Sequence, residues 1–570
     1  MAITYDFDRF LKYDELSAWL HQLVAEHPDL VALETYGRSY EGRDLLLVTV
    51  TDTDTNHGSH DTKPAHWIDA SIHAEELTAT VAACHVLQHL IDGFVAGDEQ
   101  VTRALRSRTF YVVPRVNPDG AEWVLSDTPR IRRSSVRPWP YRDGRRWPGL
   151  SIEDIDGDGR ILQMRVPDPT GAWMPHPDEP RLLVAVPPDG AVPAGTIRYR
   201  MLSEGHIEHY DGFTVPTPAP PEGLDMNRNF PAGWGTNVRG SGDHPLSEPE
   251  IDALVRAIVA RPNICGYNAF HTSGGVLLRP SSIAADSTLP PMDVWAYRQL
   301  AERGSALTGY PAHSVYEDFT WDSTETMSGA ADDWAYEHLG VYAWTTEFWD
   351  IVHAATGTKQ STHFWYTGPT TAEALAVLRW LDGEPSDHHT VGYVDWYPFD
   401  HPQLGPVELG GWNDLYTWTN PSPHLLRAEV APHAEFAVFQ ALASPCLEIK
   451  HTAVESLGDA TFRITVGIAN TGWLPTHVTA RAMKNDRVRP IVAELVGDPE
   501  TDDIRFIGAP PRQTIGQLDG GSAARFNRGH DGTPDRAIVS WVVRCPSGTD
   551  LTVTAKHDRA GQDSRTIRAE

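Results

Sequence analysis

The chain has 570 residues, of which 41% are hydrophobic and 22% are charged. This length and composition predict several domains with buried cores and exclude a disordered chain, because longer chains bury a larger share of their surface. No continuous apolar run approaches the roughly 20 residues that cross a bilayer. The net charge of −30 repels phosphate groups, so nucleic acids and anionic membranes are not expected as partners.

The first residues include Asp6 and Asp8, where a secretory signal needs a basic patch followed by an apolar segment. The four cysteines are isolated along the chain and too few for a disulfide framework. Both features predict a cytoplasmic protein with reduced cysteines. The sequence leaves the oligomeric state open.

Apolar periodicity before residue 390 alternates between helical and extended patterns. The expected elements are a helix at 13–26, strands at 44–50 and 67–72, a helix at 77–94, strands at 110–116 and 264–270, a helix at 291–307, a strand at 342–347 and a helix at 371–381. Strands that alternate with helices predict an α/β domain with a wound sheet, which we expect to fill residues 1–390.

Two stretches depart from this pattern. Residues 138–221 are dense in Pro, Gly and Arg and are interpreted as an insertion into the α/β domain. After about residue 400 the helical periodicity fades, and short strand-like runs dominate at 462–468, 478–482 and 537–543. Regularly spaced short strands with turn signals predict a β-sandwich over residues 400–570.

A candidate metal site begins with His73 and Glu76, which follow the apolar run that ends at Ile72. A His-x-x-Glu pair at the junction of a strand and a helix can place a nitrogen and an oxygen on one metal ion. An isolated pair of this kind is more often only a helix start. A catalytic zinc ion takes three protein ligands and keeps an open position for water, so a third donor is needed elsewhere.

His271 is the best candidate for that third ligand. It follows the apolar segment 264–270 and precedes a Thr-Ser-Gly-Gly turn, which places it at the carboxyl end of a strand. Open α/β sheets bind ligands at such ends. His85 and His89 lie within a helical pattern and are interpreted as solvent-facing or core histidines.

Two further polar groups suit a site that acts on carboxylates. Arg228 offers a planar guanidinium fork for a carboxylate, with a simple surface turn as the alternative interpretation. Glu347 ends an apolar, aromatic strand, where a carboxylate is costly unless it is paired or functional. Desolvation there would raise its pKa, as a general base requires.

The chain resembles the M14 family of zinc metallocarboxypeptidases through five short motifs in the family's order. They are His73-Ala74-Glu75-Glu76, Asn117-Pro118-Asp119-Gly120, Asp225-Met226-Asn227-Arg228, His271-Thr272-Ser273-Gly274-Gly275 and Ala343-Trp344-Thr345-Thr346-Glu347. No single motif is specific, but independent short matches in one order multiply. The resemblance covers residues 1 to about 385 and implies a mixed wound sheet of the zinc carboxypeptidase type.

The resemblance implies a zinc-dependent exopeptidase that hydrolyses the C-terminal bond of peptide substrates with a free carboxylate. The implied Zn2+ ligands are His73, Glu76 and His271. Glu347 is the implied general base and later proton donor, and Asp225 is the carboxylate that orients a zinc-bound histidine.

The same resemblance implies the groups that hold the substrate. Asn227 and Arg228 would bind the terminal carboxylate. Arg132 falls where the family places the arginine that polarises the scissile carbonyl and stabilises its oxyanion. Arg133 is the fallback, because this loop is rich in arginine.

The expected selectivity is for basic terminal residues. Asp332 matches the family position at the base of the side-chain pocket, where an acid favours an opposite charge. Arg279 follows His271 closely enough to line the same pocket, where it would neutralise Asp332 or attract an acidic residue. A neutralised pair that leaves selection to shape is an equal alternative.

Two departures from the family pattern stand out. The family places a substrate-capping tyrosine shortly before Asp333, where this chain reads Glu325-Thr326-Met327-Ser328-Gly329, and Tyr316 is the nearest upstream substitute. The insertion contains alternating acids and glycines from Asp154 to Asp158 that resemble half of a calcium loop. Arg165 occupies the position of the twelfth, bidentate acid, so a turn without calcium is an equal alternative and calcium is not predicted.

A hypothesis from another class is a catalytically silent protein on the same scaffold that binds carboxylates or carbohydrate. The presence of Glu347 argues against it. A serine hydrolase is disfavoured, because Ser241 lacks the Gly-x-Ser-x-Gly spacing.

Overall fold

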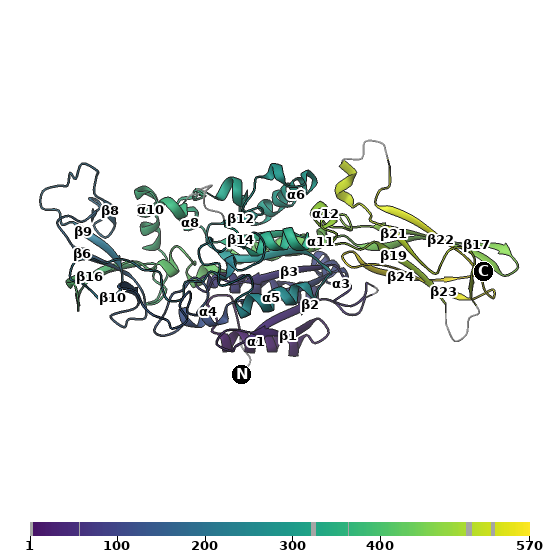
Figure 1. Cartoon of the computed structure of the whole chain (residues 1–570), viewed down its shortest axis with the longest axis horizontal. Coiled ribbons are helices and arrows are strands. Elements are labelled where there is room, and N and C mark those ends of the chain that lie inside the picture. The colour runs from purple at the N-terminus through teal and green to yellow at the C-terminus, as the bar shows by residue number, and fades with distance from the viewer. Residues whose placement is uncertain (1–3, 56, 321–326, 363, 498–503, 526–530) are drawn as a thin grey trace.

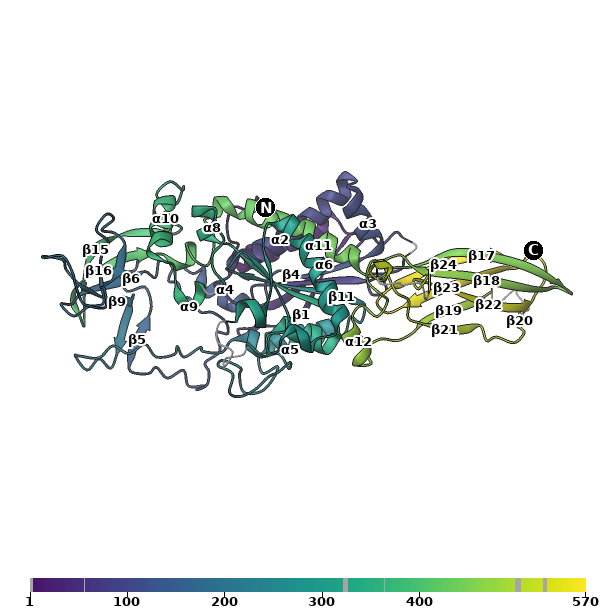
Figure 2. The same cartoon turned by 90° about the horizontal axis from the view of Figure 1, so that it is seen from above.

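The computed structural model describes the chain except for residues 1–3, 56, 321–326, 363, 498–503 and 526–530. The molecule is elongated and has three parts in a row (Figures 1 and 2). A small β-rich part occupies one end, an α/β body lies in the centre, and a β-sandwich forms the other end. The N-terminus lies on the central body and the C-terminus lies on the sandwich (Figure 1).

The central body is built on an eight-stranded mixed sheet. In spatial order its strands are β1 (Val31–Arg38), β2 (Asp44–Val50), β4 (Thr109–Val113), β3 (Ala65–Ala70), β11 (Ile264–Thr272), β14 (Tyr342–Phe348), β12 (Val276–Arg279) and β13 (Ala312–Ser314). The neighbours β4, β3, β11 and β14 run parallel. The strands β3 and β11 are buried along their whole length, as expected for parallel strands covered on both faces.

Helices pack along this sheet. The α-helices before residue 444 are α1 (Tyr13–Glu26), α2 (Leu77–Ala96), α3 (Glu99–Ser107), α4 (Pro118–Val124), α5 (Pro249–Val259), α6 (Pro291–Thr308), α7 (Ala331–Trp334), α8 (Ile351–Thr356), α9 (Phe364–Thr367), α10 (Thr371–Leu381) and α11 (Leu426–Ala443). The apolar faces of α1, α2, α3, α5, α6, α7 and α11 share one core with the sheet, whereas α4, α8, α9 and α10 pack into smaller apolar clusters. The alternation of helices and strands expected from the sequence is confirmed.

Among the described residues, α2 is the one helix long and apolar enough to cross a membrane by length and composition. It contacts β3, β11 and α11, and most of its residues from Leu77 to Ile91 are buried. We therefore interpret α2 as a core helix of the central body.

The helix α11 was not predicted from the sequence, because the helical periodicity fades after about residue 400. It packs against α2 as well as α6, so its buried residues do not follow one stripe, and Pro432 lies inside it. A helix that is apolar on several sides has no clear 3.6-residue period. Residues of α11 belong to the core of the central body.

The insertion forms two small sheets. One pairs β5 (Gly149–Ile152) with β10 (Gly205–Glu208). The other contains, in order, β15 (Tyr393–His401), β16 (Gly405–Trp412), β6 (Gln163–Pro167), β9 (Tyr199–Ser203), β7 (Trp173–Pro175) and β8 (Leu183–Ala185). The pairing of β16 with β6 joins two segments more than 200 residues apart in the sequence.

The β-sandwich consists of two four-stranded sheets. One contains β17 (Leu447–Gly458), β18 (Thr461–Asn470), β22 (Arg536–Arg544) and β20 (Arg505–Phe506), and the other β21 (Arg512–Gly516), β19 (Ile491–Val496), β23 (Asp550–His557) and β24 (Gly561–Arg568). The predicted start of this domain at residue 400 needs correction, because residues 393–443 complete the insertion sheet and the central core. Pairing between distant segments leaves no local signal that would have placed the boundary.

One strand expected in the sandwich, at 478–482, is a helix instead. Thr479 caps α12 (Ala480–Lys484), because its side chain accepts a hydrogen bond from the backbone N–H of Ala482. Val478 has a φ of 67°, which lies outside the extended region. The apolar residues of this segment therefore mark a helix start.

The sandwich is attached to the central body by buried polar contacts. Arg559, which is 6% exposed, donates to the carbonyl oxygens of Gly340 and Leu339. Asp293 of α6 accepts from the backbone N–H of Ala480 at 2.7 Å. Buried groups of this kind are costly to leave unpaired, so the junction is a specific one.

Candidate metal centre and substrate cavity

The three predicted metal ligands converge at the carboxyl edge of the central sheet. His73 and Glu76 follow β3, and His271 lies near the end of β11. His73 Nδ1 lies 2.8 Å from Glu76 Oε1 and 3.1 Å from His271 Nδ1. His271 Nδ1 lies 2.9 Å from Glu76 Oε2. All three residues are at most 2% exposed, and their donor atoms face a common point.

This donor set fits a zinc ion. Asp225 Oδ1 accepts a hydrogen bond from His73 Nε2 at 3.0 Å, which leaves the Nδ1 lone pair directed towards Glu76 and His271. Two imidazole nitrogens and one carboxylate are ligands of catalytic zinc sites, which keep a fourth position for water. His73, Glu76 and His271 are therefore the residues that would hold the metal.

The charges around the ligands also favour a cation. Burial and the nearby Arg133 lower the pKa of His73, but Glu76 and Asp225 outweigh them and raise it to about 9. Burial opposes ionisation of Glu76, yet the imidazoles of His73 and His271 lower its pKa. The carboxylates thus stabilise positive charge at the point where the donor atoms meet.

Glu347 lies beside the ligands. It pairs with His271 in the register of the parallel neighbours β11 and β14. Burial and then the charge of Glu76 raise its pKa well above the ordinary range. A carboxylate with a raised pKa next to a metal site has the properties of a general base.

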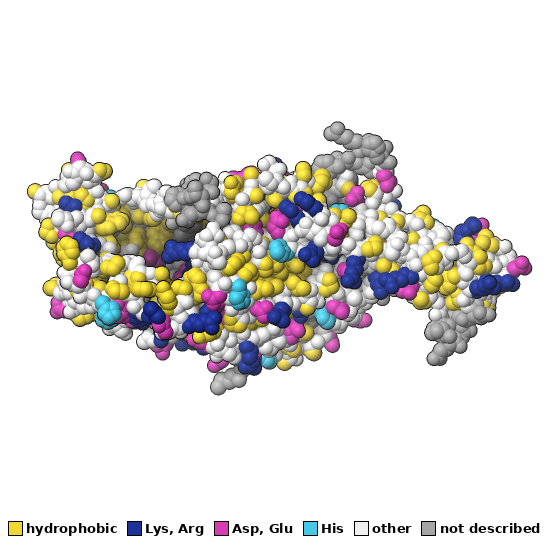
Figure 3. Space-filling view, viewed as in Figure 1, with side chains coloured by type: hydrophobic (Ala, Val, Ile, Leu, Met, Phe, Trp, Pro, Cys, Tyr) yellow, Lys and Arg dark blue, Asp and Glu magenta, His cyan; other side chains and the backbone are white. Residues whose placement is uncertain are grey.

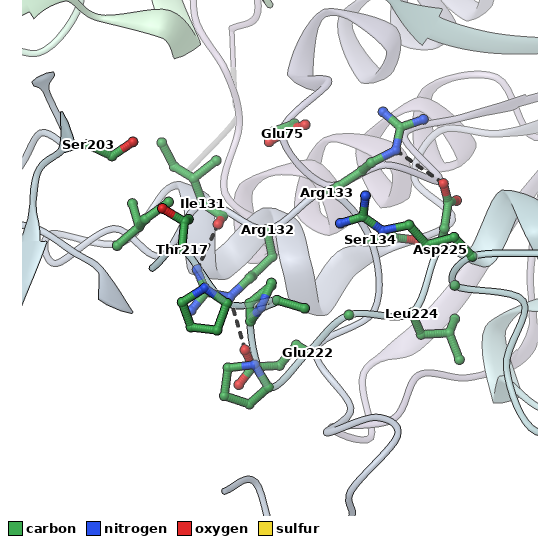
Figure 4. A pocket seen from close by; sticks show the side chains of 18 of the residues that line it. Glu75, Ile131, Arg132, Arg133, Ser134, Ser203, Thr217, Glu222, Leu224 and Asp225 are labelled. Carbon is green, nitrogen blue, oxygen red and sulfur yellow. Dashed lines mark hydrogen bonds and ion pairs between the residues drawn. The ribbon is translucent and has the colours of Figure 1, made fainter. Parts of the chain in front are cut away.

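Arg133, and not Arg132, extends towards the metal ligands. Arg133 Nε donates to Asp225 Oδ2 at 3.2 Å and its Nη1 lies 3.6 Å from Glu76 Oε1, whereas Arg132 Nε donates to Glu222 at 3.0 Å (Figure 4). The Arg133 side chain is 51% exposed and lines the cavity described below. The prediction for Arg132 is therefore corrected, because adjacent residues of this extended loop point in different directions.

The family motif around Asn117 supports this loop. Asn117 Nδ2 donates to the carbonyl oxygen of Ser134 at 2.7 Å, and its Oδ1 caps α4 by accepting from Gly120. The backbone N–H of Ala74 donates to the carbonyl oxygen of Arg133 at 2.7 Å. These bonds hold the arginine loop against the segment that carries His73.

Asn227 and Arg228 lie in the short helix η1 (Met226–Arg228) next to Asp225. Asn227 Oδ1 accepts from the backbone N–H of Ala331 at 2.9 Å. The guanidinium of Arg228 donates to the carbonyl oxygen of Asn227 at 2.8 Å and forms no ion pair among the described residues. Arg228 lines the cavity, so its remaining donors are available to a carboxylate.

Asp332 is 3% exposed and lies in α7. Arg279 does not neutralise it, because Arg279 forms a bidentate pair with Asp286 at 2.6 Å for both bonds. Asp332 accepts from the backbone N–H of Asp333 at 2.9 Å and has no ion pair among the described residues. The alternative of a neutralised Asp332–Arg279 pair is therefore wrong.

A cavity of about 1290 Å³ opens beside the metal ligands. The central body contributes Arg133, Asp225 and Arg228 to its lining, and the insertion contributes Arg146 and Leu202. Figure 3 shows this region as a hollow between the β-rich end and the central body. The insertion thus forms a wall of the candidate substrate site.

The segment 413–420 is a further part of this wall that the sequence did not reveal. The Asn420 side chain donates to the carbonyl oxygens of Glu75 at 2.8 Å and Leu415 at 3.1 Å, and accepts from the backbone N–H of Thr78 at 3.0 Å. These bonds fix the segment to the turn that carries His73. Asp414 and Glu75 both line the cavity.

The geometry does not favour Tyr316 as the substrate-capping tyrosine. The backbone N–H of Tyr316 donates to Ser281, and Tyr316 is not part of the described lining of the cavity, whereas Tyr366 of α9 is. Glu325 and Thr326 lie outside the described residues.

The acidic loop of the insertion places oxygens of Asp154, Asp156 and Asp158 within 4.8 Å of one another. Asp154 accepts from the backbone N–H groups of Gly157 and Gly159. Arg160 pairs with Asp158. The loop is held by these bonds, and we assign no calcium to it.

Comparison with known proteins agrees with the geometry of the site. A family model described as zinc carboxypeptidase matches residues 16–146 and 182–365, which is more than half of the chain. The chain belongs to the zinc carboxypeptidase family. The matched segments contain His73, Glu76, His271 and Glu347, and the gap between them falls inside the insertion. A second model, described as a domain of unknown function, matches residues 446–568.

Curated relatives belong to the same family, but each alignment covers only part of the relative and part of this chain. Carboxypeptidase B of Astacus astacus is 30% identical over 174 residues, which cover 30% of this chain and 48% of that protein. Carboxypeptidase A5 of Macaca fascicularis is 22% identical over 358 residues, which cover 61% of this chain and 62% of that protein. The chain therefore spans less than two thirds of either relative.

Among solved structures, thrombin activatable fibrinolysis inhibitor is 20% identical with a TM-score of 0.38, covering 66% of this chain and 74% of the other. Carboxypeptidase A from Helicoverpa armigera is 17% identical with a TM-score of 0.38, covering 66% and 73%. Similarities of this size add no argument to the match with the family model.

Proposed function

We propose that this protein is a zinc-dependent carboxypeptidase that hydrolyses the last bond of peptides with a free terminal carboxylate. The observation that carries the proposal is the convergence of donor atoms from His73, Glu76 and His271 directly beside Glu347. A metal site and a base in this arrangement are the two requirements for activating water. The family membership supports the same reaction class.

When bound, zinc would supply a Lewis acid and lower the pKa of a water molecule. Glu347 accepts the proton of the attacking water and donates a proton to the departing amine nitrogen. Its raised pKa suits both steps, because the group must hold the proton between them. Asp225 keeps His73 in the tautomer that presents Nδ1.

Arg133 donates hydrogen bonds to the oxygen that gains negative charge as the carbonyl is attacked. Its half-exposed guanidinium pairs with Asp225 and lines the cavity. It therefore lies between the substrate and the residues of the metal site. Arg228 binds the terminal carboxylate, with Asn227 anchoring the neighbouring segment through Ala331. The free carboxylate thus positions the last peptide bond near Glu347.

The test is release of the last amino acid from matched peptides that end in a free acid or an amide. We expect hydrolysis of the free acid only, loss of activity with a chelator, and recovery with zinc. If neither peptide is cleaved in the zinc-loaded protein while both zinc and peptide bind, the silent binding hypothesis replaces the proposal. Cleavage of the amide at the same rate would contradict the role of Arg228.

A further inference from the structure

Four charged groups in the cavity have no ion-pair partner among the described residues. Arg228 and Arg239 line it from the segment that begins at η1, and Glu75 and Asp414 line it from the segments joined by Asn420. Other charges in the lining are paired: Arg132 with Glu222, Arg133 with Asp225 and Arg146 with Glu208. The cavity therefore has a positive part and a negative part whose charges form no ion pairs of their own, although Arg133 lies close enough to Glu75 to offset part of the rise in its pKa that burial causes.

The positive part is built around η1. The backbone N–H of Asp225 donates to the carbonyl oxygen of Gly240 at 2.9 Å, which fixes the turn that carries Arg239 beside Arg228. Arg239 is exposed to the cavity. Two guanidinium groups on one wall suit a carboxylate.

The negative part lies on a different wall. Glu75 stands between the ligands His73 and Glu76, and Figure 4 shows it on the other side of Arg133 from Asp225. Asn420 joins the backbone of Glu75 to that of Leu415, the neighbour of Asp414. Desolvation by the surrounding protein, and then the charge of Glu75, raise the pKa of Asp414 to about 6. A cation between the two carboxylates would relieve this repulsion.

We propose that Glu75 and Asp414 bind a protonated amine of the substrate, while Arg228 and Arg239 bind its terminal carboxylate. This inference rests on the proposed function and names its substrate class: short peptides with an ammonium group near the scissile bond. A short peptide with free ends carries both charges. Glu75 adjoins the ligand Glu76 in the sequence, and Arg228 belongs to the same segment as Asp225, which holds His73. The insertion lines this space, and we expect this wall to favour short chains over folded proteins.

The ammonium group has two possible sources, which matched peptides separate. The first arm compares Ala-Ala-Phe with acetyl-Ala-Ala-Phe and tests the free amino terminus. The second compares acetyl-Ala-Lys-Phe with acetyl-Ala-norleucine-Phe and tests a lysine side chain. We expect kcat/KM to be about tenfold higher for the charged member in at least one arm.

Two variants assign the effect to residues. Asp414→Asn should reduce the ratio of charged to neutral substrate below about threefold, and Glu75→Gln should reduce it similarly. The control is Glu208→Gln, which removes the same charge from the same cavity but from a carboxylate already paired with Arg146. Its ratio should match that of the unmodified protein.

A binding measurement keeps the inference separate from the proposed function. Calorimetric titration of the same four peptides into zinc-loaded Glu347→Gln measures the charge preference without hydrolysis. Absence of cleavage by the unmodified protein would contradict the proposed function, and the binding ratio would still test the amine site. Ratios near one in both arms, or ratios unchanged in Asp414→Asn and Glu75→Gln, would overturn the inference.

Discussion

The two sides of the cavity differ in where they come from along the chain and in how their charges are arranged. On one side, parallel strands of the central sheet end in buried ligands, His73, Glu76 and His271, whose donor atoms are held by mutual contacts. On the other, the insertion and the segment 413–420 supply exposed or unpaired groups such as Asp414. The family match ends at residue 365, yet the cavity lining continues to Thr419.

This difference suggests a division of labour. The sheet edge fixes atoms that must meet within hydrogen-bond distance, which is a requirement of bond breaking. The attached wall presents charges to a substrate that is free to move, which is a requirement of selection. Changes at the sheet edge should abolish turnover, whereas changes in the wall should alter the choice between substrates.

The largest effect is expected from His271→Ala. The variant should lose the bound zinc, about one ion per chain in the unmodified protein, and with it all measurable peptidase activity. Metal analysis and amino acid release measure the two quantities, and a thermal melt checks that the variant is folded. Full zinc occupancy in the folded variant would remove His271 from the ligand set.

Glu347→Gln should keep zinc and fold but lose about 100- to 10,000-fold in turnover, because an amide cannot accept the proton of water. The measurement is kcat on a free-acid peptide, with zinc content determined on the same sample. The control is Glu408→Gln, which makes the same change at a carboxylate of β16 that pairs with Arg165. Near-normal turnover in Glu347→Gln would place the base elsewhere.

Arg133→Ala should lower kcat about 100- to 1,000-fold with zinc retained, because it removes a donor to the developing oxyanion. Arg132→Ala is the matched control, since it removes the neighbouring guanidinium that pairs with Glu222. We expect it to change kcat less than about tenfold. A larger loss in Arg132→Ala than in Arg133→Ala would restore the assignment made from the sequence.

Arg132 and Arg133 also show how much of the site can be predicted from the sequence. The motifs selected His73, Glu76 and His271, whose donor atoms lie together in the structure, and helical periodicity gave α1 and α10 at their observed bounds, because both signals are local. The direction of Arg132 depends on Glu222, ninety residues away, and no local pattern contains that contact. Segment 413–420 was missed for the same reason, since Asn420 acts through backbone groups of Glu75 and Thr78.

Replacing Asp332 should have a smaller effect, which concerns the choice of the terminal residue of the substrate. With Arg279 occupied by Asp286, we expect the buried Asp332 to favour a basic side chain, so peptides ending in Arg should be cleaved about tenfold better than those ending in Phe. Asp332→Ala should remove that preference. Equal rates for both peptides in the unmodified protein would show that Asp332 does not select, and an unchanged profile in the variant would make its role structural.

The smallest effect is the pH dependence of the amine preference. A carboxyl group is ionised above its pKa, so Asp414, with a pKa of about 6, attracts an ammonium group fully at pH 8 and progressively less as the pH falls through 6. A peptide with a trimethylated amino terminus keeps its charge at every pH, whereas a free amino terminus titrates near pH 8. For the trimethylated peptide, kcat/KM divided by that of the acetylated peptide should fall about threefold between pH 8 and pH 5.

Both peptides depend equally on zinc and on Glu347, so those titrations cancel in the ratio and leave the carboxylates of the amine site, Asp414 and Glu75. Burial also raises the pKa of Glu75, so the variant Asp414→Asn is needed to assign the fall to Asp414. In Asp414→Asn the ratio should be lower at pH 8 and should no longer change around pH 6. A ratio in the unmodified protein that stays constant from pH 8 to pH 5 would exclude Asp414 as the titrating group and leave selection to the shape of the wall.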